Sequence, residues 1–316
     1  MTAGAEGGDT WFSRGHVLVI GAGGQLGGEF RRALSARGVP NRGAGRAAQA
    51  GSLAIDLRAP DELEQRVVAD RPAVVINTAA YTAVDRAQVE VDEAMAVNAR
   101  APAALAAACA RCNALLVHFS SDYVFDGAAG RAYTEQDPVN PRSVYGLSKA
   151  RGEAAVCASA APHLVFRTSW MYTPGGHNFV ATMLRLFQGE APVRVVDDQV
   201  GCPTWARLLA QSVSGLLATT QAARIDAARG LYHLCGSGHT SWYGFARAIR
   251  ERAVPPARAA LEPTDTQRFG APAPRPAYSV LDCGRAQREL GVALPHWLDQ
   301  LQAAMPEFNA GCVDER

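Results

Sequence analysis

The fold is decided near the N-terminus by the stretch His16-Val17-Leu18-Val19-Ile20-Gly21-Ala22-Gly23-Gly24-Gln25-Leu26-Gly27-Gly28. Its apolar run predicts a short buried strand, its glycines a tight turn, and the pattern from Glu29 to Arg37 a helix. Gly21, Gly24 and Gly27 form a G-x-x-G-x-x-G pattern. Glycines between a strand and a helix let a pyrophosphate approach the helix N-terminus. We predict a dinucleotide site here, with a plain tight turn as the alternative.

Outward from this unit, short apolar strands alternate with helical patterns. The predicted strands cover residues 73–77, 115–120, 163–167 and 193–196, and the predicted helices cover 61–69, 92–112, 143–158 and 205–218. This alternation is typical of a parallel sheet covered by helices on both faces. The second strand is the weakest element, because residues 38–46 are rich in Gly, Pro and Arg.

The chain is expected to form two units after a short tail. Residues 1–14 are Gly-rich and polar and predict a flexible tail. Residues 15–168 and about 193–229 are assigned to a doubly wound, Rossmann-type α/β domain that binds NADP(H). Residues about 169–192 and 230–310, which include a Pro-rich stretch, are assigned to a smaller C-terminal α/β domain for the substrate.

Composition and charge exclude several classes of protein. The 316 residues are 48% hydrophobic and 19% charged, which suits a sizeable core and not a disordered chain. A formal net charge of +1 gives no electrostatic excess for nucleic acid or an anionic bilayer. No stretch resembles an export signal or a membrane span. The seven cysteines are an odd number at irregular spacing, which argues against a disulfide framework. We expect a soluble, cytoplasmic protein.

The strongest chemical signal is the segment Tyr145-Gly146-Leu147-Ser148-Lys149. Lys149 is the single lysine beside thirty arginines, and it follows a tyrosine by four residues at the start of a predicted helix. Residues four apart share a helix face, so the ammonium can favour the ionised form of the phenol. Such tuning suits a tyrosine that transfers protons near neutral pH. The alternative is a core tyrosine with a surface lysine.

A second signal follows the strand predicted at residues 115–120. Ser121 would lie at the carboxyl end of that strand, where open α/β sheets bind ligands, and its hydroxyl could donate to a substrate oxygen. Serines are also common in such turns for local reasons. Together with Tyr145 and Lys149, Ser121 completes a predicted catalytic triad.

Other patterns carry less chemistry. Cys109 and Cys112 form a C-x-x-C without a second pair, and the seven histidines show no ligand spacing, so we predict no catalytic metal. The region expected to grip the adenosine ribose offers Asn41, Arg42 and Arg46 and no carboxylate. Arginine there suits a 2′-phosphate, which favours NADPH over NADH. Solvated loop arginines are the alternative reading, and NADH stays open.

Several motifs resemble the extended short-chain dehydrogenase/reductases and, within them, the dTDP-4-dehydrorhamnose reductase family. Besides the glycine turn and the Tyr145/Lys149 pair, they are residues 77–85 (NTAAYTAVD), 120–125 (SSDYVF), 163–170 (HLVFRTSW), 178–179 (NF), 198–204 (DQVGCPT), 230–234 (GLYHL) and 275–279 (RPAYS). The resemblance runs from about His16 to the C-terminal region. It implies NADPH-dependent reduction of the C4 ketone of dTDP-4-dehydro-β-L-rhamnose to dTDP-L-rhamnose, for surface polysaccharide.

The resemblance also implies roles for individual residues. Tyr145 would protonate the C4 oxygen, and Lys149 would lower its pKa and hold the nicotinamide ribose. Ser121 stands where the family commonly has threonine and keeps the hydroxyl. The implied cofactor residues are Gly21, Gly24, Gln25, Leu26, Gly27, Asp56, Leu57, Ala79, Ala80, Tyr81, Tyr145 and Lys149. The implied substrate residues are Asp122, Tyr123, Trp170, Asn178 and Arg275.

The same resemblance leaves rivals in view. A nucleotide-sugar epimerase or dehydratase can use this scaffold, although Ser121-Asp122-Tyr123 lacks the Asp-Glu pair typical of the dehydratases. A non-catalytic subunit, like the regulatory subunit of methionine adenosyltransferase, is the rival from another class. Some relatives dimerise through acidic groups around Mg²⁺, but no such patch is identified here. The prediction therefore leaves monomer and homodimer open and assigns no Mg²⁺.

Overall fold

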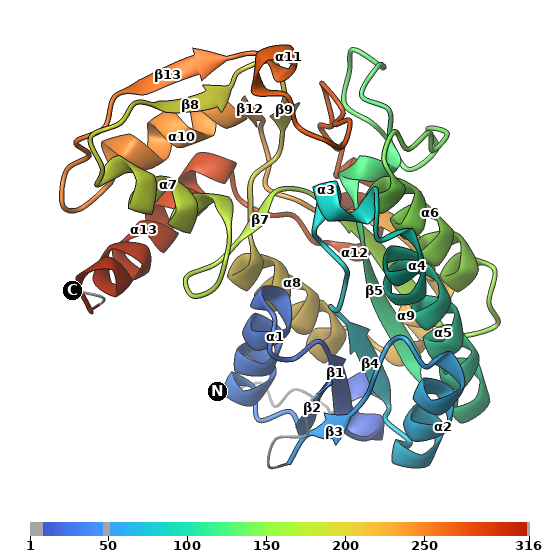
Figure 1. Ribbon diagram of the computed structural model, residues 1–316. Helices are drawn as coiled ribbons and strands as arrows, with labels where there is room; N and C mark the ends of the chain where they lie inside the picture. Colours follow the sequence, from blue (N-terminus) through green and yellow to red (C-terminus); the bar gives the residue numbers. More distant parts are fainter. Residues whose placement is uncertain (1–8, 47–50, 315–316) are drawn as a thin grey trace.

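The computed structural model describes residues 9–46 and 51–314. Its centre is a parallel sheet of seven strands in the order β11-β6-β5-β4-β1-β2-β3 (Figure 1). The strands are β1 (Val17–Ile20), β2 (Asn41–Gly45), β3 (Leu53–Ala54), β4 (Val74–Asn77), β5 (Leu115–Ser121), β6 (His163–Thr168) and β11 (Gly230–His233). Because β1 pairs with both β2 and β4, the chain winds outward in two directions. The predicted doubly wound, Rossmann-type fold is confirmed.

Helices cover both faces of this sheet. One face carries α1 (Gln25–Ala36), α8 (Ala206–Thr219), α9 (Ala222–Ala227) and α12 (Gly284–Leu290), and the other carries α2 (Pro60–Asp70), α5 (Ala101–Cys112) and α6 (Val144–Cys157). In β1, Val17 and Val19 pack with Phe30 of α1, whereas Leu18 and Ile20 pack with α2 and α5. Both faces of each central strand are therefore buried, which explains the continuous apolar runs in the sequence.

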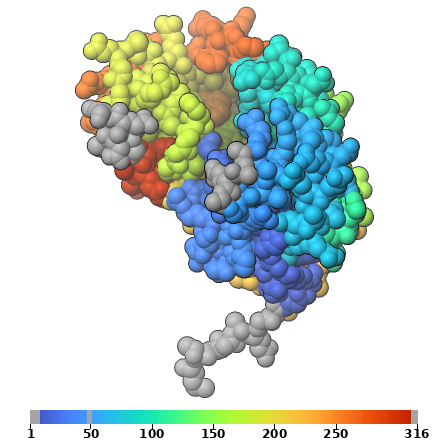
Figure 2. All heavy atoms as spheres, turned by 60° about the horizontal axis from the view of Figure 1, so that its bottom comes forward, coloured from blue at the N-terminus to red at the C-terminus, as the bar shows by residue number. Residues whose placement is uncertain are grey.

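A smaller domain has its own core. It contains three two-stranded pairs, β7 (Met171–Tyr172) with β10 (Thr204–Trp205), β9 (Val200–Gly201) with β12 (Thr240–Ser241), and β8 (Val193–Val196) with β13 (Leu261–Thr264). Its helices are α7 (Phe179–Phe187), α10 (Trp242–Glu251), α11 (Thr266–Phe269) and α13 (Trp297–Asp314). Aromatic side chains such as Tyr172, Phe245 and Trp297 fill this core. Figure 2 shows this yellow-to-red part lying beside the blue and cyan part of the sheet domain.

Two predicted strands lie in a different domain from the one to which the sequence assigned them. Val193–Val196 was assigned to the large sheet, but β8 pairs with β13 in the smaller domain. Gly230–His233 was assigned to the smaller domain, but β11 is an edge strand of the large sheet and pairs with β6. Both segments have the apolar pattern of a buried strand, and that pattern does not specify the partner strand.

The described part of the predicted tail is folded. Residues 1–8 lie outside the described residues, but Trp11–Arg14 form a short 3₁₀-helix (η1) that begins after the Thr10 cap. Trp11 is 1% exposed and belongs to the sheet-domain core, and Thr10 bridges to Gln221. The expectation of a flexible tail is wrong for residues 9–14, because one large aromatic side chain is enough to anchor a polar segment.

The predicted helix over residues 92–112 has an irregular centre. The chain forms α3 (Val84–Ala87), α4 (Val91–Met95), a π-helical turn (η2, Ala96–Arg100) and then α5. Pro102, at the start of α5, is the sequence sign of this irregularity. The π turn moves Asn98 into a buried position, 1% exposed.

The second strand, β2, contains a glycine because it packs closely against the glycine turn. A Cβ atom on Gly43 in β2 would lie 2.8 Å from the Cβ of Ala22 in the glycine turn. Glycine lowers the strand propensity of this segment, but a larger residue would keep β2 away from the turn. Gly21 has a positive φ of 79°, and a Cβ there would lie 2.8 Å from the backbone nitrogen of Ala79.

The two domains are joined by a buried carboxylate. Glu29 on α1 is 6% exposed and accepts hydrogen bonds from Thr173 at 2.7 Å and from Arg207 on α8 at 3.1 Å. Arg207 also pairs with Glu307 on α13. One arginine between two carboxylates thus connects α1, α8 and α13.

Two adjacent glycines of α1 offer a test of this packing. A Cβ on Gly27 would lie 2.2 Å from the Gly21 carbonyl oxygen, whereas a Cβ on Gly28 has its nearest neighbour at 4.0 Å. We expect Gly27→Ala to lower the free energy of unfolding by about 1–3 kcal/mol through overpacking. Gly28→Ala, the matched control, should be neutral or stabilising by up to ~1 kcal/mol. Urea denaturation measures both, and equal effects of the two substitutions would contradict the packing described.

Candidate active site

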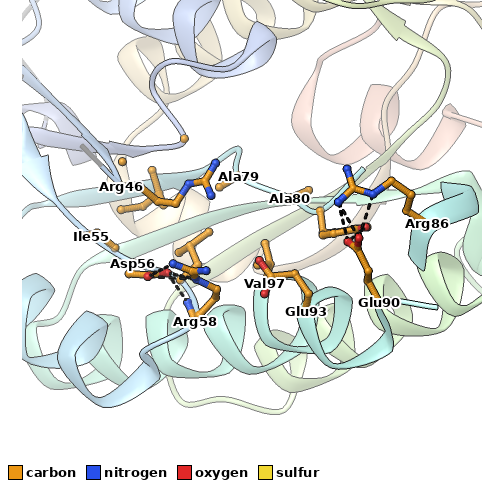
Figure 3. Close-up of a pocket in the computed structure, with 15 residues that line it drawn as sticks. Arg46, Ile55, Asp56, Arg58, Ala79, Ala80, Arg86, Glu90, Glu93 and Val97 are labelled. Carbon is orange, nitrogen blue, oxygen red and sulfur yellow. Dashed lines mark hydrogen bonds and ion pairs between the residues drawn. The ribbon is translucent and has the colours of Figure 1, made fainter. Parts of the chain in front are cut away.

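A cavity of about 610 Å³ opens beside the glycine turn at the carboxyl edge of the sheet (Figure 3). It is lined by Ile20, Gly21, Gly45, Arg46, Ile55, Asp56, Leu57, Arg58, Ala79, Ala80, Tyr81, Arg86, Glu90, Glu93 and Val97. Six predicted cofactor residues are in this lining, namely Gly21, Asp56, Leu57, Ala79, Ala80 and Tyr81. Ligands of doubly wound sheets bind at this edge.

The glycine turn ends at the N-terminus of α1. Gly24 is the N-cap residue, and it has no side chain to accept from the first helical N–H groups. Gln25, Leu26 and Gly27 form the first turn, so their N–H groups and the positive end of the helix dipole are available to an anion. A Cβ at Gly21 or Gly27 would collide with backbone. These residues therefore fit the pyrophosphate of a dinucleotide.

One end of the cavity is rich in arginine. Arg58 donates to both carboxylate oxygens of Asp56, at 2.9 and 2.6 Å, and thereby lowers the pKa of Asp56 to about 2. Figure 3 shows Arg46 beside this pair, and its charge lowers the pKa of Asp56 further. Arg42 instead pairs with Asp70 at 2.6 Å. Of the three polar candidates for a 2′-phosphate, only Arg46 lines the cavity.

The third candidate, Asn41, has a structural role. Its side-chain amide donates to the Val39 carbonyl at 3.0 Å and to the Ser35 hydroxyl at 3.2 Å. These bonds fix the entry of β2 behind α1. Asn41 does not line the cavity.

Asn98 connects the cavity with α6. Its side chain accepts from the Tyr81 N–H at 2.8 Å and donates to the Tyr81 carbonyl at 2.9 Å and to the Ser148 hydroxyl at 3.0 Å. Ser148 in turn donates to the Tyr145 carbonyl at 2.7 Å. Through Asn98, the π turn thus fixes the position of Tyr81 relative to the first turn of α6. Asn98 has no signature of its own in the sequence, although the irregularity expected at Pro102 lies close to it.

Helix α6 presents Tyr145 and Lys149 to the site. Ser143 caps the helix by accepting from the Gly146 N–H at 3.1 Å. A Cβ at Gly146 would lie 2.1 Å from the Tyr123 carbonyl oxygen, so only glycine lets α6 approach the end of β5 this closely. Ser121, the last residue of β5, lies close enough to Tyr145 to lower the pKa of its phenol. The structure therefore places these two side chains next to each other.

The pKa of Tyr145 is raised in this structure. Burial raises it to about 12, the Ser121 hydroxyl opposes the rise, and the Asp122 charge adds to it. Tyr145 therefore keeps its proton at neutral pH. The Lys149 ammonium donates to the Phe119 carbonyl at 2.6 Å, and burial lowers its own pKa to about 8. Because the carbonyl is neutral, the charge of Lys149 remains, and its effect on the phenol stays a prediction.

Asp122 is a buried anchor for three serine hydroxyls. It is 2% exposed and accepts from Ser121 at 3.0 Å, from Ser169 at 3.1 Å and from Ser279 at 2.6 Å. Burial raises the pKa of Asp122 to about 6, and the three hydrogen bonds oppose the rise. The carboxylate is enclosed by these donors. This position fits the orienting role that the resemblance implies for Asp122, because its contact with Ser121 holds that side chain.

Tyr123 and Arg275 lie next to the tyrosine. The Tyr123 ring meets the Tyr145 ring edge-on, with centroids 5.7 Å apart. Arg275 interacts with Tyr123 and forms two hydrogen bonds with Asp85, at 3.0 and 2.8 Å. The Arg275 guanidinium lowers the pKa of Asp85. Asp85, at the start of α3, belongs to the motif of residues 77–85, but it was not predicted as a site residue.

Trp170 and Asn178 lie on the smaller-domain side. Trp170 has a positive φ of 44° and stacks on Trp242, with centroids 3.5 Å apart. A non-glycine residue in this region is strained, which is common at binding sites. Asn178 caps α7 and donates to the Gln25 side chain at 3.2 Å, so it bridges the smaller domain to the glycine turn.

The described residues contain neither a metal-binding cluster nor a membrane-spanning helix. Within residues 9–46 and 51–314, no group of three or more His, Cys, Asp or Glu side chains is arranged to hold a metal ion. No helix in the described part of the chain has the length and apolarity needed to cross a membrane.

A doubly wound sheet, a glycine turn at the N-terminus of α1, and a Tyr-x₃-Lys pair beside a serine together define an extended short-chain dehydrogenase/reductase. A family model described as "RmlD substrate binding domain" matches residues 15–310. The chain belongs to the dTDP-4-dehydrorhamnose reductase family, whose members are NAD(P)H-dependent oxidoreductases.

Individual relatives agree with this assignment. The chain is 42% identical over 292 residues to a dTDP-4-dehydrorhamnose reductase of Burkholderia thailandensis, covering 89% of this chain and 95% of that one. It is 42% identical to the Streptomyces griseus protein of the same name, covering 93% and 94%. The crystal structure of a Bacillus anthracis dTDP-4-dehydrorhamnose reductase in complex with NADP is 32% identical, has a TM-score of 0.84, and covers 93% and 99%.

The raised pKa of Asp122 predicts a specific pH dependence of stability. Because the folded protein binds the Asp122 proton more tightly than the unfolded chain, this site contributes most below pH 4, and its contribution falls as the pH rises to about 6. Relative to Asp122→Asn, the free energy of unfolding of the wild type should fall by ~2 kcal/mol between pH 4 and 6. Denaturant titrations at several pH values measure this difference.

Asp126→Asn is the matched control. Hydrogen bonds from the Ala128 N–H, Tyr133 and Asn140 lower the pKa of Asp126. Its contribution is therefore present above about pH 4 and is lost as the pH falls below that value. A wild type that gained stability relative to Asp122→Asn between pH 4 and 6 would show that the buried carboxyl is not disfavoured as an anion.

Proposed function

We propose that this protein reduces the C4 ketone of dTDP-4-dehydro-β-L-rhamnose to dTDP-L-rhamnose with NADPH, and that Tyr145 is the general acid. The observation that carries the proposal is the position of Tyr145 beside Ser121, the last residue of β5, at the carboxyl edge of the sheet. Family membership supports the reaction, and the NADP complex of the Bacillus anthracis relative supports the cofactor class. In this proposal the sheet domain binds NADPH and the smaller domain binds the dTDP-sugar.

The reaction needs two donors at the carbonyl oxygen. NADPH, when bound, supplies the hydride that C4 receives. Tyr145 Oη, which keeps its proton at neutral pH, transfers that proton to the C4 oxygen as negative charge develops there. The Ser121 hydroxyl donates to Asp122 in this structure and, in this proposal, turns its single proton to the C4 oxygen when the substrate is bound.

Lys149 acts one helical turn away from the acid. Its ammonium is buried and has a pKa of about 8, so it carries a positive charge at neutral pH. That charge stabilises the phenolate that remains after proton transfer. We also assign Lys149 to the nicotinamide ribose, with the Phe119 carbonyl holding its Nζ atom in place.

The remaining binding residues follow from their positions. The turn of Gly21, Gly24, Gln25, Leu26 and Gly27 is assigned to the pyrophosphate, and Asp56, Leu57, Ala79, Ala80 and Tyr81 to the adenosine half and the centre of the cofactor. Tyr123, Trp170, Asn178 and Arg275 are assigned to the dTDP-sugar. Asp85 is added as the residue that orients Arg275.

Replacing Tyr145 by Phe tests the acid. The substitution removes the phenolic proton and should lower kcat by 10²- to 10⁴-fold, with KM for NADPH nearly unchanged. The loss of absorbance at 340 nm, with dTDP-4-dehydro-L-rhamnose generated by upstream enzymes, measures the rate. Tyr232→Phe is the control, because Tyr232 is a buried tyrosine whose hydroxyl bonds to Ala228 and Glu289 away from the site.

Two outcomes of this assay would change the proposal. A Tyr145→Phe variant that retained more than about a tenth of the wild-type kcat would remove Tyr145 as the acid. A folded wild type that binds NADPH but oxidises neither NADPH nor NADH would point to another 4-keto sugar or to a non-catalytic subunit.

The cofactor preference is tested by two arginines of the β2 region. If Arg46 contacts the 2′-phosphate, Arg46→Ala should lower kcat/KM for NADPH by about 10- to 100-fold and leave NADH little affected. Arg42→Ala removes the same charge four residues earlier, but Arg42 is paired with Asp70 and should not alter the ratio. A wild type that used NADH tenfold better than NADPH would overturn the preference.

A further inference from the structure

Three cysteines lie together behind the Asp122 anchor. Cys202, Cys235 and Cys283 belong to one hydrophobic cluster with Phe125 and Tyr133. The Sγ atoms of Cys235 and Cys283 are 3.5 Å apart, and the Cys235 N–H points at Cys283 Sγ from 3.4 Å. These two residues are far apart in the chain, so the fold alone creates the contact.

The two thiols differ in environment. Cys235, just after β11, is 1% exposed, whereas Cys283 is half-buried and precedes α12 as its N-cap residue. Hydrogen bonds to Cys202 and Cys283, together with burial, raise the pKa of Cys235. Cys283 is therefore the thiol that a small solute reaches first, and Cys235 is the thiol behind it.

The cluster is connected to the site on two sides. The Cys202 N–H donates to the Ser169 hydroxyl at 3.3 Å, and Ser169 donates to Asp122. Cys283 follows Ser279 by four residues, and Ser279 is a second donor to Asp122. A bond between Cys235 and Cys283 would tie the segment that carries Arg275 and Ser279 to the end of β11.

From this arrangement we infer that Cys235 and Cys283 are a site of reversible disulfide formation, with a peroxide as the oxidant. The bond requires the sulfur atoms to move from 3.5 Å to about 2 Å, which rotation of two side chains can supply. The inference concerns residues outside the proposed reduction and does not depend on it.

The chemistry balances in two steps. The Cys283 thiolate attacks one oxygen of hydrogen peroxide, so an S–O bond forms, the O–O bond breaks, and hydroxide leaves and takes up the thiol proton as water. The Cys235 sulfur then attacks the sulfenic sulfur, so the S–S bond forms, the S–O bond breaks, and hydroxide leaves with the Cys235 proton as a second water. Two thiols are oxidised by two electrons, and one peroxide is reduced to two water molecules.

The test uses the full-length protein, freed of reductant and exposed to stoichiometric hydrogen peroxide. Thiol titration should show a loss of two thiols per chain, and digestion without reductant should give one peptide pair that joins Cys235 to Cys283. Dithiothreitol should restore both thiols. Cys283→Ser should abolish the pair, whereas Cys157→Ser, which removes an exposed cysteine at the end of α6, should leave it unchanged.

A second variant, Cys235→Ser, tests the inference even if Cys283→Ser fails to fold. In Cys235→Ser, Cys283 should still react with peroxide but stop at the sulfenic acid, which a dimedone probe labels. Wild-type protein in which Cys283 proceeds to sulfinic acid, in which Cys235 pairs with Cys202, or in which no disulfide forms would overturn the inference.

Discussion

The buried carboxylate of Asp122 is the interaction on which the site depends. It accepts hydrogen bonds from hydroxyls at the end of β5, in the segment after β6 and in the C-terminal segment. A carboxylate enclosed in this way is stable only while its donors are in place. The position of Ser121 beside Tyr145 therefore depends on residues far along the chain. Both domains contribute residues to it.

The second constraint is steric. Glycines at positions 21, 27, 146 and 152 each allow a backbone contact that a Cβ would prevent, because an added Cβ would lie 2.0 to 2.8 Å from its nearest atom. They bring the turn against Ala79, α1 against the turn, α6 against the end of β5, and α6 against the π turn. The polar network around Asp122 and Asn98 has its short distances because these elements can approach so closely.

Local features were predictable from the sequence, and long-range partners were not. Neighbouring residues in the sequence determine the strand, glycine turn and helix near residue 21. The same is true of the Tyr145/Lys149 spacing. Ser169 and Ser279 lie 47 and 157 residues from Asp122, and no local pattern marks them as its donors. The exchange of β8 and β11 between domains has the same origin, because an apolar run reports burial and not the neighbouring strand. The Phe119 carbonyl that engages Lys149 belongs to the backbone and has no sequence signature.

The π turn over Ala96–Arg100 contains one residue more than a turn of α-helix. Deleting one residue there would restore regular α-helix and leave the flanking helices in nearly the same rotational phase, because both kinds of turn complete about one revolution. Within the turn, however, the direction of each side chain would change, and Asn98 could then no longer reach Tyr81 and Ser148 at once. The extra residue is therefore what places the amide that links the cofactor cavity to α6.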